Sequence, residues 1–274
     1  MKGNKLKAII FDWAGTLIDY GSRAPTRAFL RLFEQYSVKI SPADVRKFMG
    51  LHKRAHIKSI LNLPHVQDYF EKTYNRMPKE NDIDQLFQEF VPLQQQELEK
   101  TEIIVGAQAT VDACRSMGMK IGTCTGYTKA MMDVVVKSVR QHGFEPDAVV
   151  CADEVPQARP APFMCYENAI RMGVYPLSSM VKVGDTPEDI FEGLNAGMWT
   201  IGLARSGNLM GLSLEEEKSL AQEDVKQKIN IARAILREAG AHFVVDTVAD
   251  VPNVIAELSN HPRLPRSFDT SHAQ

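Results

Sequence analysis

The sequence predicts an α/β fold, with a Rossmann-like parallel-sheet core and an inserted helical cap domain. Two observations predict it. From residue 107 to 246, short apolar runs alternate with helical segments, an alternation typical of a parallel sheet covered by helices. Between a first apolar run at 6–13 and this alternating part, residues 25–100 show only helical spacing. We therefore expect the helical segment to interrupt the α/β core.

The first element is expected to be a strand at residues 6–13. Residues 8–11 are continuously apolar, as in strands that are buried on both faces of a sheet. Asp12 follows this run, and Gly15 and Thr16 continue into a turn. The strand therefore ends in a carboxylate.

The helical segment has recognisable start and stop signals. Ser41 and Pro42 suit the N-cap and first position of a helix, and Gly50 separates that helix from another that begins near Lys53. Further helices fit 66–77 and 81–100. We expect a core of residues 1–19 and 101–262, a helical cap domain at 20–100, and a polar tail at 263–274.

The alternating part supplies the rest of the core. Glycines close several of its helices, as they commonly do. We expect helices at 107–117, 128–141, 162–172, 187–196 and within 214–239, and strands at 119–124, 147–152, 180–184, 199–204 and 242–246.

Composition restricts the possible functions. Lys plus Arg total 32 against 34 for Asp plus Glu, a net charge of −2 in 274 residues, which gives no general attraction to nucleic acid or an anionic membrane. No apolar stretch approaches the ~20 residues of a membrane span. The four cysteines form no C-x-x-C pair, so a zinc site is not indicated. We expect a cytoplasmic protein that binds a small molecule.

Acidic residues follow two of the predicted strands. Asp12 follows the first, and Asp185 and Asp189 follow the strand at 180–184. Each also has a purely structural explanation, as the cap of a turn or the acidic first turn of a helix. Because ligands bind at the carboxyl ends of parallel strands, the combination favours Mg²⁺, which typically takes one or two carboxylates together with phosphate oxygens.

Two other strand ends suit a phosphoryl group. Thr125 and Gly126 offer a hydroxyl and exposed backbone N–H groups that can bind phosphate oxygens. Arg159, in the loop after the strand at 147–152, can neutralise phosphoryl charge. An ordinary turn and a surface arginine are the alternatives.

Taken together and in order, these residues resemble the four motifs of the haloacid dehalogenase superfamily. The set is D-x-x-G-T, then Thr-Gly, then a cation, then G-D-x-x-x-D. The resemblance implies that Asp12 is a nucleophile that forms an aspartyl-phosphate. It also implies that Asp12, Asp185 and the backbone oxygen of Ala14 bind Mg²⁺, with Asp189 in support.

Ala14 departs from the phosphatases of this superfamily, which usually carry an aspartate there as the general acid. Losing such an acid typically costs ~10²–10⁴-fold in rate, so an ester leaving group is disfavoured. A carbon leaving group needs no such acid if an amine first forms an iminium with the substrate carbonyl. Lys53 is the candidate amine, although a cap lysine is more often a solvated charge.

A narrower resemblance supports Lys53. The blocks D-W-A-G-T, M-G-L-x-K-x-x-H, T-G-Y-T, R-P-x-P-x-M-C-Y, K-V-G-D-T and N-A-G-M-W-T resemble the phosphonoacetaldehyde hydrolases. The resemblance implies a phosphonate substrate held by Lys53 as a Schiff base, with His56, Tyr127 and Met49 around it. It also suggests a homodimer formed through the cap helices.

The sequence departs from this narrower pattern at Ser22, where some relatives carry cysteine, and at Phe48, which replaces proline. Neither residue belongs to the expected covalent chemistry. Two rival hypotheses remain: a Mg²⁺-dependent phosphoester phosphatase of the same superfamily, and a non-catalytic binding protein on this fold.

Overall fold

A six-stranded parallel sheet forms the centre of the core. The computed structural model describes residues 5–140 and 143–260, so the predicted tail at 263–274 lies outside the described residues. The strand order is β3-β2-β1-β4-β5-β6, and every neighbouring pair is parallel. The predicted fold class is confirmed. The strands are β1 (Ala8–Phe11), β2 (Lys120–Thr125), β3 (Ala148–Cys151), β4 (Met180–Gly184), β5 (Trp199–Leu203) and β6 (Phe243–Val245).

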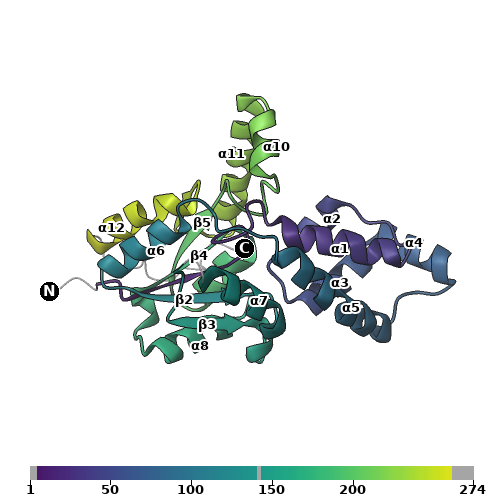
Figure 1. The fold of residues 1–274 in the computed structure, drawn as a ribbon, viewed down its shortest axis with the longest axis horizontal. Helices are drawn as coiled ribbons and strands as arrows, with labels where there is room; N and C mark the ends of the chain where they lie inside the picture. Colours follow the sequence, from purple (N-terminus) through teal and green to yellow (C-terminus); the bar gives the residue numbers. More distant parts are fainter. Residues whose placement is uncertain (1–4, 141–142, 261–274) are drawn as a thin grey trace, which may run out of the picture.

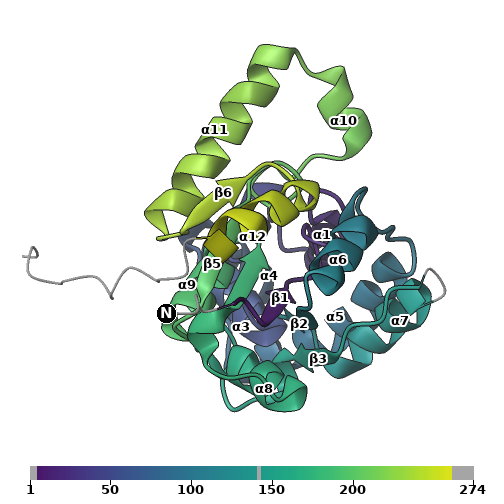
Figure 2. The ribbon, with the colours of Figure 1, turned by 90° about the vertical axis from the view of Figure 1, so that its left-hand side faces the viewer.

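Helices cover both faces of the sheet (Figure 2). Alternate residues of β1 point to opposite faces, so Ile9 and Phe11 pack in one apolar cluster while Ala8 and Ile10 pack in another. One face is covered by α6 (Ala107–Ser116), α7 (Lys129–Arg140) and α12 (Val251–Asn260), and the other by α8 (Phe163–Met172), α9 (Pro187–Asn195) and α11 (Gln222–Glu238).

Five helices are inserted between β1 and α6 and form a separate layer beside the core (Figure 1). They pack through apolar side chains: Phe29 stacks on Phe90 with 4.3 Å between ring centroids. The helical insertion is confirmed, while domain boundaries at 20 and 100 stay a prediction. The helices are α1 (Arg23–Gln35), α2 (Pro42–Arg46), α3 (Lys53–Leu61), α4 (Pro64–Tyr74) and α5 (Glu80–Leu98); we call them the cap.

The charged segment at 214–239 is two helices rather than one. Leu220 and Ala221 have extended backbone angles between α10 (Leu214–Ser219) and α11, and the pair projects from the core (Figure 1). Helix α12 was not expected. Within the described ranges, no helix has the length and apolar character needed to cross a membrane.

Candidate active site

The strand order brings the two acidic strand ends together. β1 lies between β2 and β4, with Phe11 in register with Val183. The backbone N–H of Asp12 donates to the carbonyl of Val183, at 2.9 Å. Asp12 and Asp185 therefore follow adjacent strands at the same edge of the sheet, although they are far apart in the sequence.

Core and cap residues together line a pocket. The core contributes the residues after β1, β2, β3 and β4, and the cap contributes the turn between α2 and α3. The lining residues are Asp12, Ala14, Ser22, Met49, Gly50, Lys53, Thr125, Gly126, Tyr127, Arg159, Asp185 and Thr186.

Asp12 is paired with a buried cation. Arg159 Nη2 lies 2.7 Å from Asp12 Oδ1. Burial, and then the charge of Asp189, raise the pKa of Asp12 to about 6, while Arg159 opposes the shift. Burial alone would lower the pKa of Arg159, but Asp189 and Asp12 raise it well above its ordinary value. Arg159 therefore stays charged and favours the ionised form of Asp12.

Carboxylate oxygens of Asp12, Asp185 and Asp189 lie within 4.8 Å of one another, and all three residues are buried. Among the described side chains, Asp185 has no ion-pair partner; its Oδ2 accepts a 2.7 Å hydrogen bond from the backbone N–H of Asn208. Burial, then Asp12 and Asp189, raise the pKa of Asp185 well above its ordinary value. A buried carboxylate without a cation fits a hard divalent ion bound by oxygen ligands.

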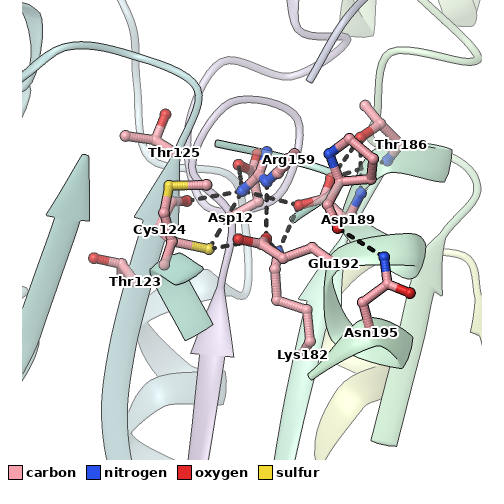
Figure 3. A network of polar contacts seen from close by, with 12 residues as sticks. Asp12, Thr123, Cys124, Thr125, Arg159, Lys182, Thr186, Asp189, Glu192 and Asn195 are labelled. Atoms are coloured by element: carbon pink, nitrogen blue, oxygen red, sulfur yellow. Dashed lines mark hydrogen bonds and ion pairs between the residues drawn. The ribbon is translucent and has the colours of Figure 1, made fainter. Parts of the chain in front are cut away.

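Behind the pocket, Asp189 lies in a network of buried charges (Figure 3). It lies 3.0 Å from Arg159 and 2.5 Å from Lys182. These two cations outweigh burial and lower the pKa of Asp189. Glu192 contacts Arg159 Nε at 2.9 Å. Asp189 also completes a capping box with Thr186 at the start of α9. The same carboxylate therefore caps a helix and pairs with the cations beside the pocket.

Lys53 is the first residue of α3, and only 2% of it is exposed. Its Nζ lies 3.9 Å from Met49 Sδ and 5.0 Å from the centre of the Tyr127 ring. Burial lowers the pKa of Lys53 to about 8, and the carboxylate of Asp12 only partly offsets this. About one tenth of the amine is therefore neutral at pH 7, one unit below this pKa.

The cap contacts the end of β2 directly. A Cβ atom on Gly126 would lie 2.7 Å from the carbonyl oxygen of Leu51, so glycine permits this approach. Thr125 Oγ1 accepts a 3.2 Å hydrogen bond from the backbone N–H of Tyr127. Burial raises the pKa of the Tyr127 phenol well above its ordinary value, which keeps that group neutral.

His56 is not among the residues that line the pocket. Its Nε2 lies 2.8 Å from the carbonyl oxygen of Val45, and its ring packs 4.2 Å from that of Phe29. Burial, and then Lys53, lower its pKa well below the ordinary value. Phe48 packs at the edge of the same ring, 6.2 Å between centroids. A direct contact of His56 with substrate stays a prediction, and the structure gives this residue a packing role.

Sequence reasoning missed several residues of this region. Ser22 was noted only as a difference, yet it lines the pocket, as do Gly50 and Thr186. Lys182 and Glu192 were not singled out as charges. One signal was available for Lys182: a lysine inside an apolar strand requires a buried partner. Glu192 had no comparable signal.

A parallel sheet with aspartates after adjacent strands, a buried cation beside them and a helical cap defines the haloacid dehalogenase class of hydrolases. The haloacid dehalogenase-like hydrolase family matches residues 9–203. Phosphonoacetaldehyde hydrolase of Syntrophobacter fumaroxidans is 42% identical over 256 residues, which cover 93% of this chain and 92% of that protein. The enzyme of the same name from Bacillus cereus is 40% identical over 255 residues, with coverage of 93% and 97%.

A solved structure agrees with these relatives. The crystal structure of a phosphonoacetaldehyde hydrolase-like protein from Oleispira antarctica matches with a TM-score of 0.93 at 34% identity, covering 95% of this chain and 96% of that one. The chain therefore belongs to the phosphonoacetaldehyde hydrolase family, within the haloacid dehalogenase-like hydrolases.

Proposed function

We propose that this protein hydrolyses the carbon–phosphorus bond of phosphonoacetaldehyde, giving acetaldehyde and phosphate. The observation that carries the proposal is that Lys53 and Asp12 line one small pocket together with Arg159. An amine, a carboxylate and a guanidinium are the groups needed to bind an aldehyde, attack phosphorus and neutralise phosphoryl charge.

The amine acts first. Neutral Lys53 condenses with the substrate aldehyde, water leaves, and the protonated imine becomes an electron sink. The lowered pKa of Lys53 supports this role because only the neutral amine is nucleophilic. Burial of the amine supports it too, because limited access of solvent slows premature hydrolysis of the imine.

Asp12 then attacks phosphorus. The phosphorus–carbon bond breaks, its electron pair enters the iminium, and an enamine forms on Lys53. Protonation of the enamine and hydrolysis of the resulting iminium release acetaldehyde, while a second water releases phosphate from Asp12. Arg159, the hydroxyl of Thr125 and the backbone N–H of Gly126 bind the phosphoryl oxygens.

The buried carboxylates of this site fit Mg²⁺, a hard cation that prefers oxygen ligands. Asp12, Asp185 and the backbone oxygen of Ala14 would hold the ion, and Asp189 would support it by orienting Arg159. When bound, the ion supplies positive charge for the phosphoryl oxygens. The buried, unpaired carboxylate of Asp185 supports this choice. Met49, Tyr127 and His56 would shape the pocket around the imine.

The direct test mixes purified protein with phosphonoacetaldehyde and Mg²⁺ and follows acetaldehyde and phosphate together, with and without a chelator. Equal release of both products, abolished by the chelator and restored by added Mg²⁺, is expected. Phosphate release from common phosphoesters at a comparable rate would favour the phosphatase alternative, against which Ala14 argues. Binding of substrate without any product would favour a non-catalytic protein.

A homodimer through the cap helices and a cytoplasmic location also stay predictions. Sedimentation of the purified protein would test the first: a monomer at micromolar concentration would contradict it. The chemistry above uses residues of a single chain.

A further inference from the structure

Asn208 contacts both the core carboxylate and the cap. It lies in the loop that follows β5, is 3% exposed and belongs to none of the motifs used above. Its backbone N–H donates to Asp185 Oδ2 at 2.7 Å, and its side-chain Nδ2 donates to the backbone carbonyl of Arg46 at 3.1 Å. Arg46 is the last residue of α2.

The contacts continue from Arg46 to Lys53. The carbonyl of Arg46 also accepts a 3.2 Å hydrogen bond from the N–H of Met49, and Met49 Sδ lies 3.9 Å from Lys53 Nζ. A short path of directional contacts thus joins Asp185, through Asn208, to the turn that presents Lys53.

The loop after β5 that contains Asn208 packs tightly against both Asp185 and Arg46. A Cβ atom on Gly207 would collide with the Cβ atom of Asp185, and one on Gly211 would collide with Nε of Arg46. Arg46 Nη2 also donates to the carbonyl of Gly211, at 2.6 Å. The loop therefore has little room to shift without moving either Asp185 or α2.

We propose that Asn208 is a positioning residue that couples the state of Asp185 to the placement of the Met49–Lys53 turn. A divalent cation bound at Asp185 fixes that carboxylate, and Asn208 transmits the constraint to Arg46. The inference rests on the proposed function for the roles of Asp185 and Lys53. Because linkage is reciprocal, the cation stabilises this placement of the turn as much as this placement favours the cation.

The test measures hydrogen exchange of the full-length protein with and without Mg²⁺, on peptides that span residues 42–53. Exchange reports local opening of the cap independently of catalysis. In the wild type, Mg²⁺ is expected to slow exchange there by roughly five- to tenfold, the lower range of typical couplings between sites. In Asn208→Ala the backbone contact to Asp185 remains, the contact to Arg46 is lost, and the Mg²⁺ effect should shrink to less than about twofold.

Gln95→Ala is the matched control. Gln95 Nε2 of the cap donates to the carbonyl of Ala130 in the core, at 2.8 Å, so the variant removes a cap–core hydrogen bond of the same chemistry that does not involve Asp185. Loss of either hydrogen bond can speed exchange in the cap without Mg²⁺, but only Gln95→Ala should keep the wild-type response to the ion. Asn208→Ser, whose hydroxyl is too short to reach Arg46, is a second variant, and thermal unfolding checks that each is folded.

Three results would overturn the coupling: no Mg²⁺ response in the wild type, a full response in Asn208→Ala, or an equal loss in Gln95→Ala. The proposed function fails separately. A wild type that shows the Mg²⁺ response but releases no acetaldehyde or phosphate from phosphonoacetaldehyde would refute the assigned reaction and keep the coupling. An active wild type whose hydrogen exchange does not respond to Mg²⁺ would refute the coupling and keep the assigned reaction.

Discussion

The guanidinium of Arg159 donates a 2.7 Å hydrogen bond to the carboxylate of Asp12, and both side chains are buried. This ion pair links the carboxyl end of β1 to the loop that follows β3. Because Arg159 offsets part of the burial cost of Asp12, the carboxylate can stay ionised although it is buried. A phosphoryl group that reaches Asp12 also reaches Arg159.

Replacing Asp12, the proposed nucleophile, should abolish turnover. Asp12→Asn keeps the shape of the side chain but removes the charge and the attacking oxygen, so we expect acetaldehyde and phosphate release to fall by at least ~10³-fold. Asp112→Asn is the control: Asp112 is exposed, and among the side chains of the described residues only Gln108 donates to its carboxylate. The activity of this variant should be normal. Turnover of Asp12→Asn near the wild-type rate would exclude Asp12 as the nucleophile.

Lys53→Arg should prevent covalent capture of the substrate. Arginine retains the positive charge but does not form an imine under these conditions. Borohydride added with substrate should increase the mass of the wild type through a reduced adduct and leave Lys53→Arg unchanged. Lys58→Arg, on the same helix but exposed and paired with Glu80, should label normally. An adduct on Lys53→Arg would place the imine elsewhere.

The rate of adduct formation should depend on the protonation of Lys53. Burial lowers the pKa of this amine to about 8 from an ordinary 10.5. The neutral, nucleophilic fraction therefore rises about tenfold per pH unit below 8 and levels off above it. Single-turnover trapping between pH 6 and 9.5 measures this profile. A rate that is still rising tenfold per unit at pH 9.5 would mean that the amine is not perturbed.

Ala14→Asp should introduce phosphoester hydrolysis. An aspartate at this pocket position could protonate an alkoxide leaving group, a contribution of typically ~10²–10⁴-fold. Hydrolysis of p-nitrophenyl phosphate and sugar phosphates measures the gain. Ala14→Asn has the same size without the acid and should show no gain. Equal rates for the two variants would mean that the absence of an acid at position 14 does not determine the choice of leaving group.

Lys182→Met should destabilise the fold. The ammonium is fully buried and lies 2.5 Å from Asp189, and breaking a buried pair costs about 3–5 kcal/mol. Arg159 still faces Asp189 at 3.0 Å, so we expect a loss of ~3 kcal/mol, at the lower end, which lowers Tm by roughly 6–12 °C. Lys226→Met removes an exposed lysine that lies 3.9 Å from Glu223 and should shift Tm by ~1 °C or less. Equal shifts would contradict a structural role for the buried pair.

Local patterns were sufficient to predict the strands of the core. The strand expected at 180–184 is β4 with the same bounds, and the strand expected at 199–204 is β5, one residue shorter. Apolar runs and glycines predict where strands lie and where helices end, because strand burial and helix termination depend on residues that are adjacent in the chain. Helix α12 was not anticipated, although Val251, Val254, Ile255 and Leu258 recur at helical spacing. The division between α10 and α11 was not anticipated either, since it has no equally clear local signal.

The sequence by itself determined the fold class, the inserted helices and the residues at the strand ends, because these follow from local periodicity and from ordered motifs. Only the tertiary structure decided what those residues contact. It placed β1 between β2 and β4, paired Arg159 with Asp12, packed His56 away from the pocket lining and set Asn208 between Asp185 and Arg46. Such contacts join residues that are distant in the chain, and their geometry depends on the packing of the whole sheet and cap rather than on any local pattern.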